Sequence, residues 1–310
     1  MPKVSVIIPT YNRSEILKKS IGSVINQTFE DFELLVMDDG SDDNTQEVVR
    51  SFADKRILYA RNESNLGVVG ARNKAVSNSN GEYIAFLDDD DIWMPDKLER
   101  QTRLMEQSPS SIGAIYTGFY TVDDEINKIV KVMVPRYRGN ILEDILYYNF
   151  IATSTVLIKR ECFEKTGLFD EKICYGEDFD MWIRVLEEYE FDYIKDPLVR
   201  YLIHPDRITT NYGAVIKGLE EIMNKHKSLF SLNNKAYSTN KLRIGIAYCM
   251  TGDTKAGRKE FFKALKSYPF DTKLFYNIAI SLFGPFVFKK IIETKESILS
   301  STYALEDTGK

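Results

Sequence analysis

The chain has 310 residues, of which 44% are hydrophobic and 28% are charged, and its formal net charge is −5. This composition is typical of a folded globular protein with one large domain or two smaller ones. The acidic balance and the dispersed basic residues exclude a typical nucleic-acid-binding surface, because phosphate binding requires a basic face. Three cysteines without paired spacing predict neither a disulfide framework nor a zinc site. The first residues lack the pattern of a signal peptide, so we expect a cytoplasmic protein.

The N-terminal part of the chain alternates between strand and helix patterns. Short apolar runs rich in β-branched residues predict strands over 4–8, 32–37, 56–60 and 82–87. Apolar residues at helical spacing predict helices after Ser14, around 48–52 and over 70–79, with Ser14 as the N-cap of the first. Strands and helices that alternate in this way form βαβ units, so we expect a largely parallel sheet covered on both faces.

Three polar turns follow these predicted strands. They are "PTYNRS" at 9–14, "DDGSDD" at 38–43 and "DDDD" at 88–91. Right-handed crossovers place such turns along the carboxyl edge of a parallel sheet, where open α/β sheets bind their ligands. We therefore expect the three turns to lie close together and to form a binding site.

The four consecutive aspartates at 88–91 need a source of positive charge. Two unit charges about 4 Å apart repel each other by about 1 kcal/mol in water and by about 4 kcal/mol at an effective dielectric constant near 20. Oxygen ligands of this kind suit Mg²⁺ or Mn²⁺, and Mg²⁺ usually takes only one or two carboxylates and completes its shell with water and substrate phosphates. The acidic turn therefore predicts a site for a metal-bound diphosphate. The alternative is a solvated turn that caps the next helix, since charge runs are usually exposed.

Several segments together resemble the family-2 inverting glycosyltransferases of GT-A fold. They are "VSVIIPTYNRSEILKKSIGSVINQTFEDFELLVMDDGSDDNT", "NLGVVGARNKA", "GEYIAFLDDDD" and "GEDFDMWIR", in the order and with the spacing of that family. The resemblance covers about the first two thirds of the chain. It implies an α/β fold of GT-A type, with a mostly parallel sheet and helices on both faces, in a catalytic domain over 1–205. A helical C-terminal region over 206–310 would follow.

The resemblance implies a donor site for a nucleoside-diphosphate sugar, with a UDP-sugar as the expected donor. Pro9, Thr10 and Tyr11 match the segment that packs against the nucleotide base. Asp39 matches the carboxylate that accepts from the uracil N–H, and Arg72 matches a basic residue at the floor of the nucleotide site.

The resemblance also implies a D-x-D pair formed by Asp88 and Asp90. Asp90 would ligate Mn²⁺ or Mg²⁺, and Asp88 would face the ribose or the donor sugar. Because four aspartates follow one another, the register is open by one position, and Asp89 remains a candidate. His204 is a further candidate for contact with the metal or the diphosphate, although a lone histidine is more often structural.

A helix that begins after Gly176 is predicted to carry the catalytic base. Asp178 lies in its first turn, four residues before Trp182 and on the same face. The resemblance implies that Asp178 takes the proton from the acceptor hydroxyl, which then attacks the anomeric carbon with inversion, and Glu177 beside it is assigned to donor binding. The alternative is that both acids only complement the helix dipole.

The C-terminal part is predicted to be helical from about residue 205 onward. The stretch 241–269 resembles one tetratricopeptide helix pair, which is too few for a solenoid. The apolar stretch 274–288 is shorter than the roughly 20 residues that span a bilayer. With Lys289 and Lys290 behind it, the segment 274–290 is a candidate for peripheral contact with the inner face of a membrane. A core helix or a homodimer contact is the favoured alternative.

These patterns predict a metal-dependent, inverting, hexosyltransferase-type glycosyltransferase. The expected acceptor is a carbohydrate or a lipid-linked molecule, as in the synthesis of cell-envelope polysaccharide, glycolipid or glycoprotein, and no nucleic-acid partner is expected. One alternative is a nucleotidyltransferase, but the turn after the first strand lacks the glycine-rich basic loop of those enzymes. The other is a non-catalytic protein that binds sugar nucleotides.

Overall fold

A computed structural model describes residues 1–123, 128–203 and 211–294 of the chain. The chain forms two compact units and passes between them more than once. The first unit consists of Met1–Ile141, Ile151–Glu171 and Met181–Ile203, and the second of Leu142–Phe150, Lys172–Asp180 and His204–Lys310. The domain border expected at residue 205 lies outside the described residues.

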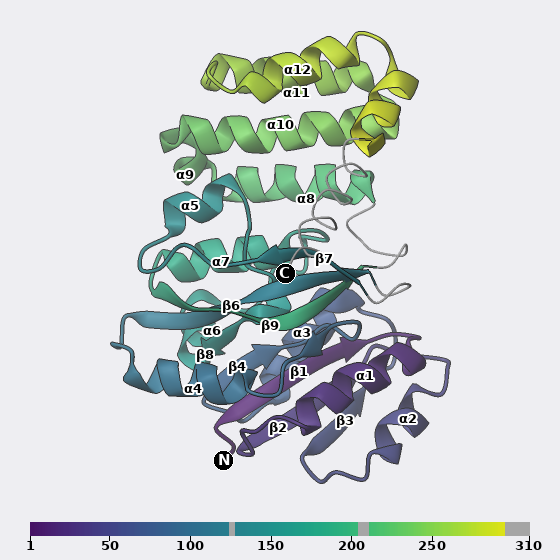
Figure 1. Ribbon diagram of the computed structural model, residues 1–310, viewed down its shortest axis with the longest axis vertical. Coiled ribbons are helices and arrows are strands. Elements are labelled where there is room, and N and C mark those ends of the chain that lie inside the picture. Colours follow the sequence, from purple (N-terminus) through teal and green to yellow (C-terminus); the bar gives the residue numbers. More distant parts are fainter. Residues whose placement is uncertain (124–127, 204–210, 295–310) are drawn as a thin grey trace, which may run out of the picture. The chain divides into compact units, whose positions relative to one another are not determined.

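Nine strands of the described residues form one sheet in the first unit, with the order β3-β2-β1-β4-β8-β6-β9-β5 and with β7 paired to β6 (Figure 1). The strands are β1 (Val4–Thr10), β2 (Phe32–Asp38), β3 (Ile57–Arg61), β4 (Tyr83–Phe86), β5 (Ile92–Trp93), β6 (Ile112–Asp123), β7 (Lys128–Met133), β8 (Leu157–Lys159) and β9 (Glu190–Ile203). The sequence prediction of parallel strands is confirmed for β1 to β4. Beyond β4 the pairing is mixed: β8 is antiparallel to both of its neighbours, whereas β6 and β9 are parallel.

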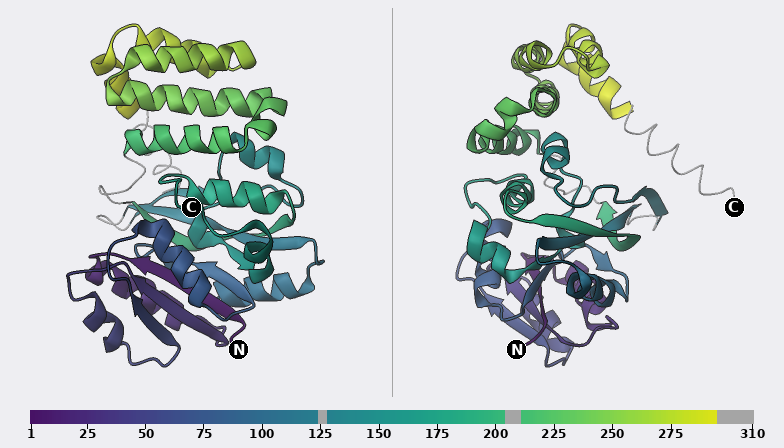
Figure 2. Two further views of the ribbon diagram at one scale, coloured as in Figure 1. Left: turned by 180° about the vertical axis from the view of Figure 1, so that it is seen from behind. Right: turned by 90° about the vertical axis from the view of Figure 1, so that its left-hand side faces the viewer.

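Helices cover both faces of this sheet, as predicted (Figures 1 and 2). Those of the first unit are α1 (Ser14–Ile25), α2 (Thr45–Ser51), α3 (Gly67–Asn78), α4 (Lys97–Gln107), the 3₁₀ turn η1 (Thr153–Thr155), α6 (Arg160–Thr166) and the later part of α7 (Glu177–Leu186). Val6 of β1 shares one hydrophobic core with Leu17 of α1 and Leu98 of α4. On the other face, the ring of Phe86 packs edge-on against that of Phe163 from α6. All seven residues of β1 are buried because both faces are covered.

The start of α1 differs from the sequence prediction. Ser14 is the first helical residue, not the N-cap, and Arg13 before it makes no side-chain cap. The backbone N–H of Ser14 instead donates to Oδ2 of Asp43 at 3.0 Å. A carboxylate from the loop after β2 therefore satisfies one of the free N–H groups of α1, where negative charge is also favoured by the helix dipole.

The second unit is helical, as predicted. Its elements are α5 (Leu142–Tyr147), the first turn of α7, α8 (Tyr212–Lys225), α9 (Lys227–Leu232), α10 (Asn234–Thr251), α11 (Thr254–Ser267), α12 (Thr272–Ser281) and a further helical segment over 285–294. The predicted helix pair is α10 and α11, which approach so closely that a Cβ at Gly245 would overlap the ring of Phe261. Across the described ranges, every helix is too short or too polar to cross a bilayer.

Candidate active site

The four aspartates after β4 divide into two partly exposed and two buried side chains. The side chains of Asp88 and Asp90 are 30% and 19% exposed, whereas that of Asp89 is 8% exposed. Asp91 is fully buried. The turn thus presents every second carboxylate to solvent and holds the other two inside the first unit.

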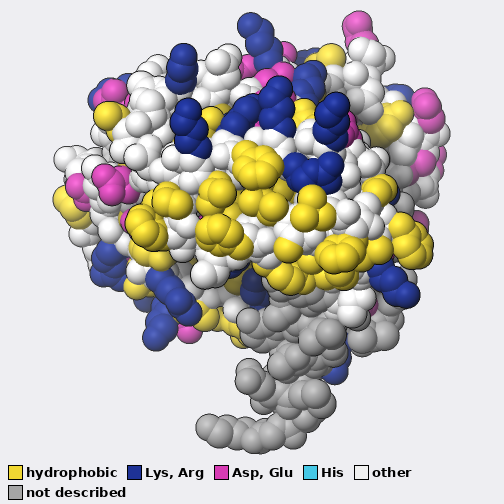
Figure 3. Space-filling model, turned by 90° about the horizontal axis from the view of Figure 1, so that it is seen from above, with side chains coloured by type: hydrophobic (Ala, Val, Ile, Leu, Met, Phe, Trp, Pro, Cys, Tyr) yellow, Lys and Arg dark blue, Asp and Glu magenta, His cyan; other side chains and the backbone are white. Residues whose placement is uncertain are grey.

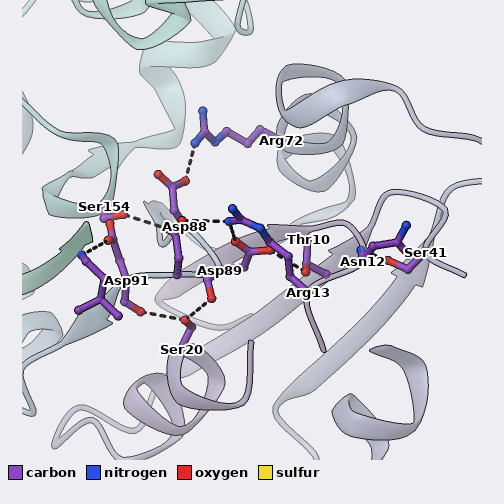
Figure 4. Close-up of polar contacts among 12 residues, drawn as sticks. Thr10, Asn12, Arg13, Ser20, Ser41, Arg72, Asp88, Asp89, Asp91 and Ser154 are labelled. Carbon is purple, nitrogen blue, oxygen red and sulfur yellow. Dashed lines mark hydrogen bonds and ion pairs between the residues drawn. The ribbon is translucent and has the colours of Figure 1, made fainter. Parts of the chain in front are cut away.

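Asp89 is held by the last residue of β1 and by the turn that follows this strand (Figure 4). Its Oδ2 accepts from Oγ1 of Thr10 at 2.8 Å, and its Oδ1 accepts from Nη1 of Arg13 at 2.9 Å. Burial raises the pKa of Asp89 to about 6, and the charge of Asp90 adds to this rise, whereas Arg13 and Thr10 oppose it. Asp89 is therefore a structural carboxyl group that joins the ends of two neighbouring strands.

Asp91 is buried more deeply still. Burial raises the pKa of Asp91 well above its ordinary value, and the charges of Asp88 and Asp90 raise it further. Its Oδ1 accepts from the backbone N–H of Leu202 at 3.3 Å. The hydroxyl of Ser20 from α1 donates to the backbone oxygens of both Asp89 and Asp91, at 2.7 and 2.8 Å. These bonds fix the backbone of the acidic turn against α1.

Arg13 supplies positive charge to two of the four carboxylates. Its Nη1 lies 2.9 Å from Oδ1 of Asp89 and 2.9 Å from Oδ2 of Asp90. The sequence analysis missed this residue. The sequence contained one signal for a role of Arg13, its position next to the predicted donor-binding segment. Its pairing with Asp89 and Asp90 could not be read from the sequence, because these residues are more than 70 positions away.

Arg72 lies on the other side of the acidic turn. It is 3% exposed, and its Nη2 donates to Oδ1 of Asp88 at 2.5 Å (Figure 4). Its guanidinium also lies 5.9 Å from the ring centroid of Phe169. Asp88 and Asp90 thus each have an arginine partner, and these arginines come from α3 and from the turn after β1.

Asp39 is buried where β2 ends. Its Oδ1 accepts from Nδ2 of Asn62 at 2.7 Å, and both of its carboxylate oxygens accept from the backbone N–H of Leu66 at 2.9 and 3.0 Å. Its own N–H donates to the backbone oxygen of Thr10 at 2.9 Å. The preceding Asp38 has different partners, the N–H of Ser41 and the hydroxyl of Tyr59.

The structure therefore places most of the predicted donor-binding residues at one edge of the first unit. Thr10 connects them, since its backbone oxygen bonds to Asp39 and its hydroxyl to Asp89. Pro9 is buried inside β1, whereas Tyr11 is 42% exposed just beyond it. The expected meeting of the three polar turns is confirmed by these contacts.

The residues of this edge fit a divalent cation that arrives with a diphosphate. Among the described residues, no group of three His, Cys, Asp or Glu side chains could hold a metal by itself. Asp88 and Asp90 nevertheless offer partly exposed carboxylate oxygens, which are the ligand type of Mg²⁺ and Mn²⁺. One or two such carboxylates are enough when substrate phosphates and water complete the shell. His204 lies outside the described residues.

The predicted base Asp178 lies in the second unit, in the first turn of α7 together with Glu177. It is half-buried, and its Oδ2 accepts from Nδ2 of Asn149 at 2.9 Å. Asp180, which is fully buried, has Oδ1 2.8 Å from Nε2 of His226 and 2.9 Å from Nζ of Lys225. The sequence analysis missed Asn149 and the partners of Asp180, because each pairing joins distant parts of the chain.

A mixed α/β sheet whose parallel strands end in acidic turns fits the class of GT-A-type glycosyltransferases. The sequence profile described as glycosyl transferase family 2 matches residues 5–167, and the chain belongs to this family. The family resemblance seen in the sequence is thereby confirmed, and the chain is a glycosyltransferase.

Two curated relatives illustrate this similarity. An uncharacterised glycosyltransferase of Methanocaldococcus jannaschii is 35% identical over 221 residues, which are 70% of this chain and 75% of the relative. The Escherichia coli protein named UDP-Glc:alpha-D-GlcNAc-diphosphoundecaprenol beta-1,3-glucosyltransferase WfgD is 34% identical over 217 residues, which are 69% of this chain and 82% of the relative.

Two solved structures share the fold. The mannosyltransferase PcManGT from Pyrobaculum calidifontis, in complex with GDP-Man and Mn²⁺, superposes with a TM-score of 0.63 at 17% identity and covers 99% of this chain and 87% of its own. S. aureus TarS 1-349 in complex with UDP-GlcNAc gives a TM-score of 0.61 at 18% identity, covering 86% of this chain and 89% of its own. The predicted GT-A fold is confirmed by this likeness.

Proposed function

We propose that the chain is a metal-dependent, inverting hexosyltransferase that moves a sugar from a UDP-sugar to an acceptor hydroxyl. The observation that carries this proposal is the alternation in the acidic turn. Asp88 and Asp90 are partly exposed and Asp89 is buried, so the pair available to a donor is Asp88-x-Asp90. Asp89 is occupied by Thr10 and Arg13, and we assign it no contact with the metal.

The nucleoside binds beside the ends of β1 and β2 in this proposal. The exposed ring of Tyr11 offers a face for the base, with Pro9 and Thr10 fixing the backbone behind it. Asp39 accepts from the uracil N–H. Its Oδ2 receives only the Leu66 N–H in the described structure, and a carboxylate oxygen has two acceptor sites. This use of Asp39 requires a base that presents an N–H donor, which uracil does.

The diphosphate binds above Asp88 and Asp90. Asp90 would hold Mn²⁺ or Mg²⁺, and the bound cation would supply positive charge to the leaving diphosphate. Arg13 shares Oδ2 of Asp90 and must move aside or turn to the diphosphate when the donor binds. Arg72, held by Asp88, adds a second fixed cation near the leaving group. His204 is a further candidate for this contact.

Asp178 acts as the general base. Its carboxylate takes the proton of the acceptor hydroxyl, the acceptor oxygen bonds to the anomeric carbon, and the bond from that carbon to the diphosphate oxygen breaks with inversion. Asn149 orients the carboxylate through its bond to Oδ2. We assign Glu177, next to it in the first turn of α7, to donor binding.

The names of related proteins support these choices of substrate. The E. coli relative is named for UDP-Glc and for a lipid-linked diphosphoundecaprenol acceptor. Of the structures with the same fold, one holds UDP-GlcNAc and the other GDP-Man with Mn²⁺. We accordingly propose a UDP-hexose donor and a carbohydrate or lipid-linked acceptor of cell-envelope synthesis, with the chain acting in the cytoplasm.

Calorimetric titration with a panel of UDP-sugars and GDP-sugars, with and without Mn²⁺, tests the donor site. We expect a UDP-sugar to bind with Mn²⁺, Asp90→Asn to remove the dependence on the metal, and Asp39→Ala to remove the preference for UDP. Asp31→Asn is the matched control, because Asp31 is exposed and precedes β2 at the opposite end of the strand. Binding without metal that neither variant changes would contradict the proposal.

The base is tested separately, by the slow hydrolysis of the donor in which water takes the place of the acceptor. Asp178→Asn should lower this rate on the order of 10²- to 10⁴-fold while donor affinity stays the same. Glu187→Gln, an exposed acid just beyond the end of α7, should leave both unchanged. Nuclear magnetic resonance of the first sugar released gives its anomeric configuration, and retention would refute the inverting mechanism.

A further inference from the structure

Helix α11 carries a row of basic side chains on one face. Lys255, Lys259 and Lys266 follow one another at helical spacing and are exposed, and Arg258 and Lys263 flank them. Together with the 56% exposed ring of Phe262 they line a shallow hollow. Within the described ranges, no acidic side chain forms an ion pair with Lys255, Lys259 or Lys266.

A row of exposed apolar side chains runs along α12 and the turn that follows it. Phe275 on α12 is 54% exposed, and Leu282 and Phe283 in the turn after it are 69% and 71% exposed. Phe286, at the start of the helical segment over 285–294, is 77% exposed. Phe270, before α12, is 78% exposed, and its ring meets that of Tyr268 edge-on. The hydrophobic core of the second unit is formed by other side chains, such as Leu274 and Phe288.

The basic row and the apolar row belong to one surface of the second unit. Figure 3 shows a band of hydrophobic side chains with Lys and Arg side chains gathered along one border. We call this the α11–α12 surface, and it comprises the exposed residues of the two rows just described. A large contiguous apolar patch on a protein surface usually marks an interaction site.

The charge of the α11–α12 surface differs from that of the whole chain. The chain has a formal net charge of −5, yet α11 contains five basic residues and one acidic residue. That acidic residue, Glu260, is 5% exposed and is paired with Lys241 and Lys263. This surface therefore fits a partner that is both anionic and apolar.

We propose that the α11–α12 surface binds the interface of a bilayer that contains anionic phospholipids. The lysines of α11 face the headgroup phosphates, and the rings of Phe275, Phe283 and Phe286 enter the boundary between headgroups and acyl chains. The sequence prediction for 274–290 relied on Lys289 and Lys290 for the charge, whereas the structure adds the whole basic row of α11. The inference does not depend on sugar transfer, because membrane binding is measured without donor or acceptor.

The test is co-sedimentation of the full chain with vesicles of phosphatidylcholine alone and of equal parts of phosphatidylcholine and phosphatidylglycerol. We expect binding to the anionic vesicles that weakens as salt is raised. Each lysine near an anionic surface contributes about fivefold to the binding constant. A triple variant should therefore bind the anionic vesicles at least about a hundredfold more weakly, as expected for the loss of three charges. It carries Lys255→Glu, Lys259→Glu and Lys266→Glu. The matched control reverses three exposed lysines elsewhere, Lys55, Lys131 and Lys227, and should retain binding.

A second variant tests the apolar row. Phe283→Ser with Phe286→Ser changes two highly exposed side chains, so circular dichroism should show an unchanged fold. The binding constant for vesicles should fall by on the order of tenfold. The binding that remains at high salt should fall as well, because it depends on the apolar side chains. Equal binding to neutral and anionic vesicles, or no loss in the α11 variant, would overturn the proposal. A different result would also overturn the proposal. If the parent chain does not bind vesicles but forms a dimer in sedimentation velocity, and the double phenylalanine variant dissociates this dimer, then a second copy of the chain covers the surface.

Discussion

Replacing Asp89 by asparagine should make the first unit more stable at neutral pH and leave it unchanged in acid. The carboxyl group of Asp89 is buried between the ends of β1 and β4, and burial raises its pKa from 3.8 to about 6. The asparagine side chain has nearly the same shape and keeps an oxygen for Arg13, while the hydroxyl of Thr10 can accept from its amide. The substitution therefore removes the ionisation and little else.

The size of the effect follows from the two pKa values. Between about pH 4 and about pH 6 the folded chain holds a proton that the unfolded chain has lost, so the folded state loses stability as the pH rises. A difference of about 2 pKa units corresponds to about 3 kcal/mol in the free energy of unfolding. The advantage of Asp89→Asn should thus be near zero at about pH 4, grow through the window and stay level above about pH 7.

Urea unfolding followed by tryptophan fluorescence measures this difference. Both tryptophans of the chain, Trp93 and Trp182, are buried in the first unit, so their signal reports that unit alone. Subtracting the parent chain from the variant at each pH cancels the titration of all other groups. Asp31→Asn, an exposed carboxylate, is the control and should show no pH-dependent difference. A constant difference between Asp89→Asn and the parent over the whole range would refute the reasoning.

Three further predictions use the same approach. Burial lowers the pKa of Lys97 well below its ordinary value, so the unfolded chain binds a proton that the folded chain lacks, and the stability of the parent chain rises with pH. Lys97→Met should therefore raise the free energy of unfolding by about 1 to 3 kcal/mol at about pH 7 and by less at about pH 9. An equal gain at both pH values would contradict this prediction. Arg13→Gln removes the cation that Asp89 and Asp90 share, and it should lower the free energy of unfolding by about 2 kcal/mol at about pH 8. The loss should be smaller at about pH 5, where Asp89 is protonated. A loss that does not depend on pH in the tryptophan assay would contradict the prediction. Gly245→Ala forces a Cβ against the ring of Phe261 and should lower the free energy of unfolding of the second unit by about 1 to 3 kcal/mol. Circular dichroism should show a lower thermal midpoint, while the transition followed by tryptophan fluorescence should stay unchanged.

The regular part of the fold was predictable because local patterns determine it. The apolar runs at 4–8 and 32–37 are buried on both faces in β1 and β2, which is why they read as continuous hydrophobic segments. The strands β6 and β9 pair in parallel over a long stretch, yet β8, which pairs with β6 from the other side, is antiparallel to it. No short-range pattern encodes such a pairing, so this half of the sheet was not foreseen.

The candidate site was predictable in its residue types and not in its internal contacts. The acidic turn, Asp39 and Arg72 follow from the ends of strands and from the family resemblance. The bridge from Arg13 to Asp89 and Asp90 depends on distances of a few ångströms between separate loops, and sequence spacing contains no such distances. The same reason explains why Ser14 was taken for a cap that Asp43 in fact provides.

The order of the four aspartates along the chain also determines how the enzyme tolerates changes in the length of this turn. Leu87 is held to Ile7 by its backbone N–H, so the first residue after it always occupies the outward position. Deletion of any one aspartate would leave carboxylates at the first three positions and move Ile92 into the innermost one, which is already sealed from water. Such a deletion would also pull Ile92 and Trp93 out of register with β9, so the pairing of β5 fixes the length of this turn even though a single amino acid is repeated in it.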